Sequence, residues 1–139
     1  VTVQNPNLMK AVVSQVGIYD MLRYELSPNG AFNIPEYGSV KNPEQYKALK
    51  AYSPYQHVQN DISYPAMLIT TGANDQRVDP MHSRKMAARL QKATASELPI
   101  LFRAEFNAGH GGGTPLPIRI NEITDEYIFF MKFLNIPFE

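Results

Sequence analysis

The stretch Tyr64-Pro-Ala-Met-Leu-Ile-Thr-Thr-Gly72 decides the fold of this chain. It is an apolar run that ends at a glycine, which is typical of a buried strand. A polar cluster, Asn74-Asp-Gln-Arg77, follows it directly, and Asp79-Pro80 then opens the segment Met81–Lys92, which is rich in helix formers. The pattern therefore predicts a strand, a polar loop and a helix in that order.

Two more strands are predicted, one on each side of this unit along the chain. Ala11-Val-Val-Ser-Gln-Val-Gly17 is rich in β-branched residues and ends at a glycine, and Pro99–Phe106 is a second apolar run. A helix is expected to begin at Asn42-Pro43, because asparagine caps free amide groups and proline needs no hydrogen bond at the first helical position. The segment 20–40 is dense in proline and glycine, which favours loops and short turns.

A terminal helix is predicted from Arg119 onwards. Apolar residues recur there at spacings of three and four, which places them on one helical face: Ile120, Ile123, Tyr127, Met131 and Leu134. The aromatic residues Tyr127, Phe129, Phe130 and Phe133 are expected on the buried side of this helix. Strands that alternate with helices predict an α/β fold with a mostly parallel sheet and flanking helices.

Asp75 and His110 each lie a few residues past the end of a predicted strand. Functional groups of parallel sheets gather at the carboxyl ends of the strands. An aspartate that accepts a hydrogen bond from one imidazole nitrogen leaves the other nitrogen to take a proton from a nucleophile. The order Asp before His is that of α/β-hydrolases, in which the serine comes first.

No serine of this chain lies in the Gly-x-Ser-x-Gly turn that exposes the nucleophile of an α/β-hydrolase. Ser14, the serine of the first predicted strand, is expected to be packed or hydrogen-bonded. We therefore expect the nucleophile to precede Val1, in keeping with an N-terminal sequence that has no initiator Met and reads as internal.

Simpler interpretations of the same residues stay open at this point. Asp75 could serve only to accept hydrogen bonds from backbone amides in a turn. Arg77 could be a surface charge or an ion-pair partner of Asp79, and His110 could be an exposed loop residue. His110-Gly-Gly-Gly113 spells a lipase oxyanion motif, but no serine follows it, and the glycines lack the Gly-Lys-Ser/Thr ending of a phosphate-binding loop.

Composition excludes several classes of partner. The chain has 139 residues, with 13 Lys+Arg against 13 Asp+Glu, so it has no basic field for nucleic acid or for anionic membranes. The apolar run Tyr127–Met131 is far shorter than the ~20 residues of a membrane span. The absence of cysteine excludes thiol catalysis and thiolate metal sites but leaves the compartment open. The histidines lack metal-ligand spacing, so we expect no metal and no cofactor.

Several segments, in the same order along the chain, resemble the C-terminal part of the prolyl oligopeptidase family of serine peptidases. They are Ser14–Leu22, Glu36-Tyr-Gly38, Tyr52-Ser-Pro54, Tyr64–Leu68, Asn74–Val78 and Ala108–Gly111. In that family the catalytic domain is an α/β-hydrolase capped by a β-propeller. The resemblance implies that residues 1–139 are the C-terminal portion of a peptidase catalytic domain, with the nucleophile segment and the propeller upstream.

The resemblance also implies roles for single residues. Asp75 and His110 match the acid and the base of the Ser-Asp-His triad, and Arg77 matches an arginine that hydrogen-bonds the carbonyl of bound peptide. Ile18 and Val78 fall where the family lines the pocket for the residue before the cut, and Tyr37 falls beside that pocket. The implied substrate is an oligopeptide, cleaved after proline in many members.

The chain departs from the proline-specific pattern in one respect. Those members stack a Trp on the substrate proline, whereas this chain has no Trp and carries Asn33 nearest the matching position, next to Phe32. Ester hydrolysis, dipeptidyl or aminopeptidase action, and a non-catalytic interaction module therefore stay open as alternatives. The isolated fragment is expected to be inactive and to self-associate through its uncovered sheet edge.

Overall fold

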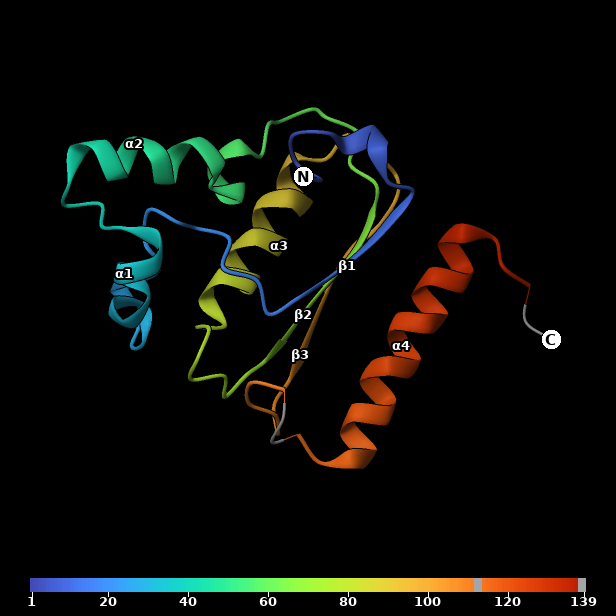
Figure 1. Cartoon of the computed structure of the whole chain (residues 1–139). Helices are drawn as coiled ribbons and strands as arrows, with labels where there is room; N and C mark the ends of the chain where they lie inside the picture. The colour runs from blue at the N-terminus through green and yellow to red at the C-terminus, as the bar shows by residue number, and fades with distance from the viewer. Residues whose placement is uncertain (112–113, 138–139) are drawn as a thin grey trace.

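The computed structural model describes residues 1–111 and 114–137, and its centre is a three-stranded parallel sheet (Figure 1). The strands are β1 (Ala11–Gln15), β2 (Ala66–Gly72) and β3 (Ile100–Glu105), in the order β1-β2-β3. β2 is buried along its whole length because it has a neighbour on both sides. The predicted parallel sheet is confirmed, and each strand is slightly shorter than its apolar run.

Helices cover both faces of this sheet, as the alternation of elements predicts (Figure 1). On one face α3 (Met81–Ala93) buries Met86 and Leu90 in a core that includes Ile69 of β2. On the other face α4 (Leu116–Leu134) buries Phe129 against Leu68. Neighbouring residues of one strand thus serve opposite faces, because successive side chains of a strand point in opposite directions.

The face that α4 turns to the sheet differs in part from the predicted one. Phe129, Phe130 and Phe133 pack on the sheet, as expected. Tyr127 is 67% exposed, and most of the aliphatic stripe is exposed with it: Ile120, Ile123 and Leu134. The helix has apolar residues on more than one face, and its contact with three strands is too narrow to cover them all.

The segment between β1 and β2 forms a second, smaller cluster beside the sheet. It contains the 3₁₀ turns η2 (Tyr24–Leu26) and η3 (Gly30–Asn33), and the helices α1 (Ile34–Tyr37) and α2 (Pro43–Tyr52). The side chain of Asn42 accepts hydrogen bonds from the first amides of α2, which confirms the predicted cap. η1 (Pro6–Leu8) precedes β1, and η4 (Pro54–His57) follows α2.

Within residues 1–111 and 114–137, no helix has the length and apolarity required to cross a membrane. Two of the three glycines that follow His110, Gly112 and Gly113, lie outside the described residues.

Candidate active site

Two loops at the carboxyl ends of β2 and β3 are hydrogen-bonded to each other. The Ala73 amide donates to the Glu105 carbonyl at 2.8 Å, and the Asn74 amide donates to the Ala108 carbonyl at 3.1 Å. The side-chain amide of Asn74 also donates to the Phe106 carbonyl at 2.7 Å. Because the two strands are parallel neighbours, the loop that carries Asp75 and the loop that carries His110 leave the sheet side by side.

Gly72, the last residue of β2, permits this close approach. A Cβ atom at position 72 would lie 2.4 Å from the carbonyl oxygen of Gly109 and 2.7 Å from that of Ala108. Such distances are shorter than real carbon contacts, so any side chain here would push the histidine loop away. Gly72 therefore ends the strand and also lets the backbone next to His110 rest against it.

Asp75 uses both of its carboxylate oxygens. Its Oδ2 lies 2.7 Å from Nδ1 of His110, and its Oδ1 accepts hydrogen bonds from the amides of Arg77 and Val78, each at 2.9 Å. The Asp75 side chain has no exposed surface, whereas that of His110 is 32% exposed. One oxygen of Asp75 thus makes the turn contacts, and the other makes the contact with His110.

The imidazole of His110 lines a cavity of about 430 Å³ at the end of the sheet. Among the described residues, no hydrogen bond is made to its Nε2 atom, so this nitrogen is available to a group that enters from outside. Val16, on the same cavity wall, has a backbone φ of 43°, which is strained for a β-branched residue. Strain of this kind is typical of functional sites.

The residues matched to the substrate pocket are largely brought together. Ile18, Arg77 and Val78 line one small depression, which is closed in this structure and has no space for a water-sized group. Tyr37 stands behind it, because its ring packs edge-on against the ring of Tyr24 at 5.7 Å between centroids, and Tyr24 lines the depression. Arg77 is exposed and makes no ion pair with Asp79.

The two residues near the expected Trp position, Phe32 and Asn33, lie differently in the structure. Asn33 lines the depression, whereas Phe32 is 89% exposed and turns away from it. Asn33 therefore contributes a small amide to the depression, and Phe32 does not line it.

The hydroxyl of Ser14 bonds the hydroxyl of Tyr19 at 2.7 Å, as expected for a serine inside a strand. Across the described part of the chain, no group of three or more His, Asp or Glu side chains is placed to hold a metal ion.

Sequence reasoning missed two buried polar residues beside the depression, Asp20 and His82. For Asp20, the available signal of burial was its position as the single charge inside the apolar run Gly17–Leu22.

A parallel sheet that holds an Asp–His pair at the carboxyl ends of adjacent strands, with the Asp first in the chain, has the arrangement of an α/β-hydrolase. The sequence profile of the prolyl oligopeptidase family matches residues 1–136. The chain belongs to this family, and its fold is the C-terminal part of the α/β-hydrolase fold.

Individual relatives agree with this assignment. A prolyl endopeptidase from Dictyostelium discoideum is 40% identical over 136 residues, which are 96% of this chain and 18% of the relative. A solved structure from a mechanistic study of two prolyl endopeptidases superposes with a TM-score of 0.93 at 43% identity, over 98% of this chain and 20% of that one.

A third comparison is with prolyl oligopeptidase B from Galerina marginata, bound to a 35mer hydrolysis and macrocyclization substrate and carrying a serine-to-alanine change. It has a TM-score of 0.86 and 32% identity, over 94% of this chain and 18% of that one. Companion structures carry a histidine-to-alanine or an aspartate-to-alanine change. The chain thus spans about a fifth of the length of the proteins it matches.

Proposed function

We propose that this chain supplies the acid and the base of a Ser-His-Asp triad in a serine peptidase that hydrolyses peptide bonds in oligopeptides. One observation carries the proposal: the buried carboxylate of Asp75 lies 2.7 Å from Nδ1 of His110, and the His110 ring lines a cavity. Membership of the prolyl oligopeptidase family supports the reaction class.

The reaction follows from the chemistry of the pair. Asp75 holds the proton on Nδ1, so the Nε2 atom of His110 accepts the proton of the serine as its oxygen attacks the peptide carbonyl. The imidazolium then gives this proton to the leaving amine, and the serine is left acylated. Water attacks the acyl group in the second half, with His110 again as base and then as acid.

Arg77 and the depression beside it position the substrate. Arg77 is exposed next to the Asp75 turn, and its guanidinium would donate hydrogen bonds to a carbonyl of the bound peptide. Ile18 and Val78 give the residue before the cut an apolar wall, and Asn33 replaces the aromatic ring of proline-specific members. We propose cleavage after small apolar residues, proline included, without a strict requirement for proline.

The remainder of the catalytic domain supplies the serine, and a β-propeller precedes it. Two features support the assignment of the serine to a segment outside this chain. The chain spans about a fifth of its relatives, and β1 and β3 each have a strand neighbour on one side within the described residues. The cavity at the end of the sheet is where a nucleophile turn would approach His110.

The test is the substitution His110→Ala in the full-length protein. We expect kcat to fall by about 10³-fold or more with little change in KM, because the ring acts on the reacting atoms. His57→Ala is the matched control, since His57 bonds the Ser53 carbonyl in η4, away from the pair. Near-normal turnover of His110→Ala would end the assignment.

A fluorophosphonate probe, which modifies activated serines, gives a second readout. The full-length protein is expected to be labelled, and the isolated chain of 139 residues is expected to remain unlabelled because the serine lies outside it. Stoichiometric labelling of the isolated chain would show that one of its own serines is the nucleophile.

A further inference from the structure

A buried carboxylate that the triad does not use lies close to the substrate depression. Asp20 has no exposed surface, and its Oδ2 atom is bonded by Nζ of Lys85 at 2.6 Å and by Arg23 Nη1 at 3.1 Å. Its Oδ1 atom accepts a hydrogen bond from Nε2 of Gln56 at 2.9 Å. A buried charge is tolerated only when it is paired and hydrogen-bonded in this way.

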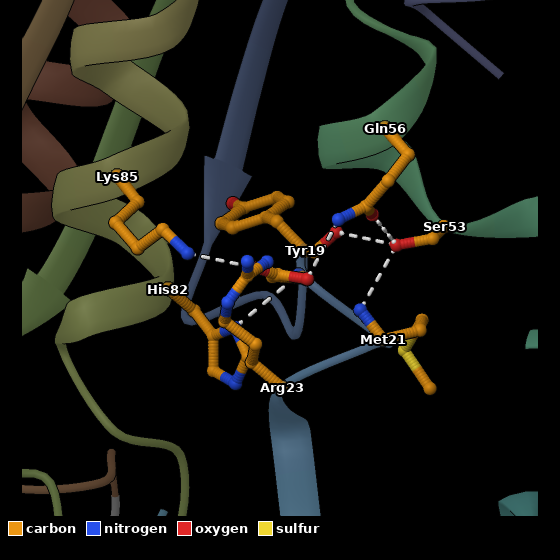
Figure 2. Close-up of polar contacts among 8 residues, drawn as sticks. Tyr19, Met21, Arg23, Ser53, Gln56, His82 and Lys85 are labelled. Carbon is orange, nitrogen blue, oxygen red and sulfur yellow. Dashed lines mark hydrogen bonds and ion pairs between the residues drawn. The ribbon is translucent and has the colours of Figure 1, made fainter. Parts of the chain in front are cut away.

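The backbone on both sides of Asp20 is held as well (Figure 2). The Asp20 amide donates to Nδ1 of His82 at 3.3 Å, and the Met21 amide donates to the hydroxyl of Ser53 at 2.9 Å. The carbonyl of Tyr19 accepts from the amide of Tyr55 at 2.9 Å. These contacts join three elements: the loop after β1, the turn η4 with its preceding residue, and α3.

We call this set the Asp20 hub; it consists of Asp20, Arg23, Ser53, Gln56, His82 and Lys85. The hub connects the two apolar walls of the depression. Ile18 lies two residues before Asp20, and Val78 lies four residues before His82. Ile18, Val78 and His82 all line the depression. The distance between the walls therefore depends on the contact of the Asp20 loop with α3.

We propose that Asp20 is a positioning residue for substrate selection, which controls how far the closed depression opens by holding the Ile18 loop against the start of α3. The proposal rests on the proposed peptidase function. Asp20 does not touch the Asp75–His110 pair, so its effect is on which residue is accepted before the cut and not on the activation of the serine.

The charge of Asp20 is needed for this role. Burial raises the pKa of its carboxyl, but the hydrogen bonds from Lys85, Gln56 and Arg23 and the charge of Lys85 together lower it below the ordinary value. Lys85 and Arg23 keep 30% and 54% of their side-chain surface exposed. If the Asp20 carboxylate is removed, the side chains of Lys85 and Arg23 can turn to water. The Ile18 loop is then released, and no unpaired charge stays buried.

The test uses the full-length protein with Asp20→Asn, and with Lys85→Met as a second variant that spares the carboxylate. The matched controls are Glu44→Gln and Lys47→Met, which break an exposed ion pair of 2.8 Å. The substrates are two quenched oligopeptides that differ only in the residue before the cut, proline in one and glycine in the other. The rate of fluorophosphonate labelling is measured in parallel.

We expect Asp20→Asn to reduce the ratio of kcat/KM for the proline peptide over the glycine peptide by about tenfold, mainly through KM. Lys85→Met should shift the ratio in the same direction, and the labelling rate should stay within about twofold of wild type. The controls should change neither quantity.

Three outcomes would overturn the proposal: an unchanged ratio in both hub variants, equal losses for both peptides and for labelling, or a wild-type enzyme that does not discriminate between the peptides. Failure of the proposed function itself looks different. In that case the wild-type protein is neither labelled by the fluorophosphonate nor able to cleave either peptide.

Discussion

At the scale of single residues, the carboxylate of Asp75 joins the His110 ring to the turn that carries Arg77 and Val78. One oxygen orients His110, and the other holds the amides of Arg77 and Val78, which line the depression. A shift of this carboxylate would therefore move the His110 ring and the residues of the depression together. An aspartate suits both tasks because it accepts hydrogen bonds on both oxygens.

The substitution Asp75→Asn separates these two tasks. The asparagine oxygen can still accept from the Arg77 and Val78 amides, but its NH₂ group then faces Nδ1 of His110 and selects the wrong tautomer. We expect kcat to fall on the order of 10³ to 10⁴-fold in the full-length enzyme, with KM nearly unchanged. Steady-state kinetics measure this, and a large rise in KM would show that the turn had been lost.

His82 makes the stability of the pocket region sensitive to acid. Burial and the charge of Lys85 lower its pKa, and they outweigh Asp20 and Asp79, which raise it. The ring therefore stays neutral in the folded protein at pH values where it is already protonated in the unfolded chain. The stability contribution is fully present above the unfolded pKa of about 6.5 and is lost as pH falls from there through the lowered folded value.

The variant His82→Asn tests this, because the asparagine oxygen can accept from the Asp20 amide and does not titrate. The drop in melting temperature between pH 8 and pH 5 should be smaller in the variant than in wild type. The charged groups that act on His82, namely Asp20, Asp79 and Lys85, are unchanged in both proteins. Equal drops would show that His82 does not titrate in this range.

At the scale of elements, the ends of β2 and β3 assemble the pair. The two strands are in register as far as Gly72 and Glu105, and the loops beyond them share three hydrogen bonds. The geometry of the pair therefore depends on the backbone beneath it as well as on the two side chains.

Gly72→Ala should disturb this arrangement without altering either member of the pair. The new methyl group would lie 2.4 Å from the Gly109 carbonyl oxygen, so the His110 loop must move. We expect a loss of at least about tenfold in kcat, since misplacement by about 1 Å is costly. Gly109→Ala is the comparison, because its methyl group would meet the nearest atom at 3.5 Å; a loss as large as that of Gly72→Ala would refute the steric argument.

At the scale of the whole molecule, the chain exposes apolar surface beside its sheet. On the side of β3 and α4, large apolar side chains are 36% to 67% exposed: Leu101, Phe102, Tyr127 and Ile128. Across the described residues, both outer strands also keep one unpaired edge. Unpaired edges and exposed apolar groups are a template for association.

We therefore expect the isolated chain to self-associate. Sedimentation velocity at several concentrations should show species larger than the 15.7 kDa monomer, with the fraction increasing with concentration. Co-expression with the preceding part of the catalytic domain should suppress the association by covering the edge. A monodisperse, cooperatively folding monomer at all concentrations would contradict the expectation.

The sequence by itself determined the order of elements, the parallel sheet and the two residues of the pair. These follow from local causes: apolar runs that end at glycine, the Asn42 cap, and polar residues placed just after strands. The family motifs extended this to Arg77, Ile18 and Val78, which the structure places around one depression.

The tertiary structure alone decided the burial of Asp20, the partners of His82 and the side of α4 that meets the sheet. It also placed Asn33 in the depression and Phe32 outside it. The physical reason is that these outcomes depend on groups distant in the sequence. The carboxylate of Asp20 is stable when buried because the fold brings Lys85 and Gln56 into contact with it. No local sequence pattern encodes these contacts.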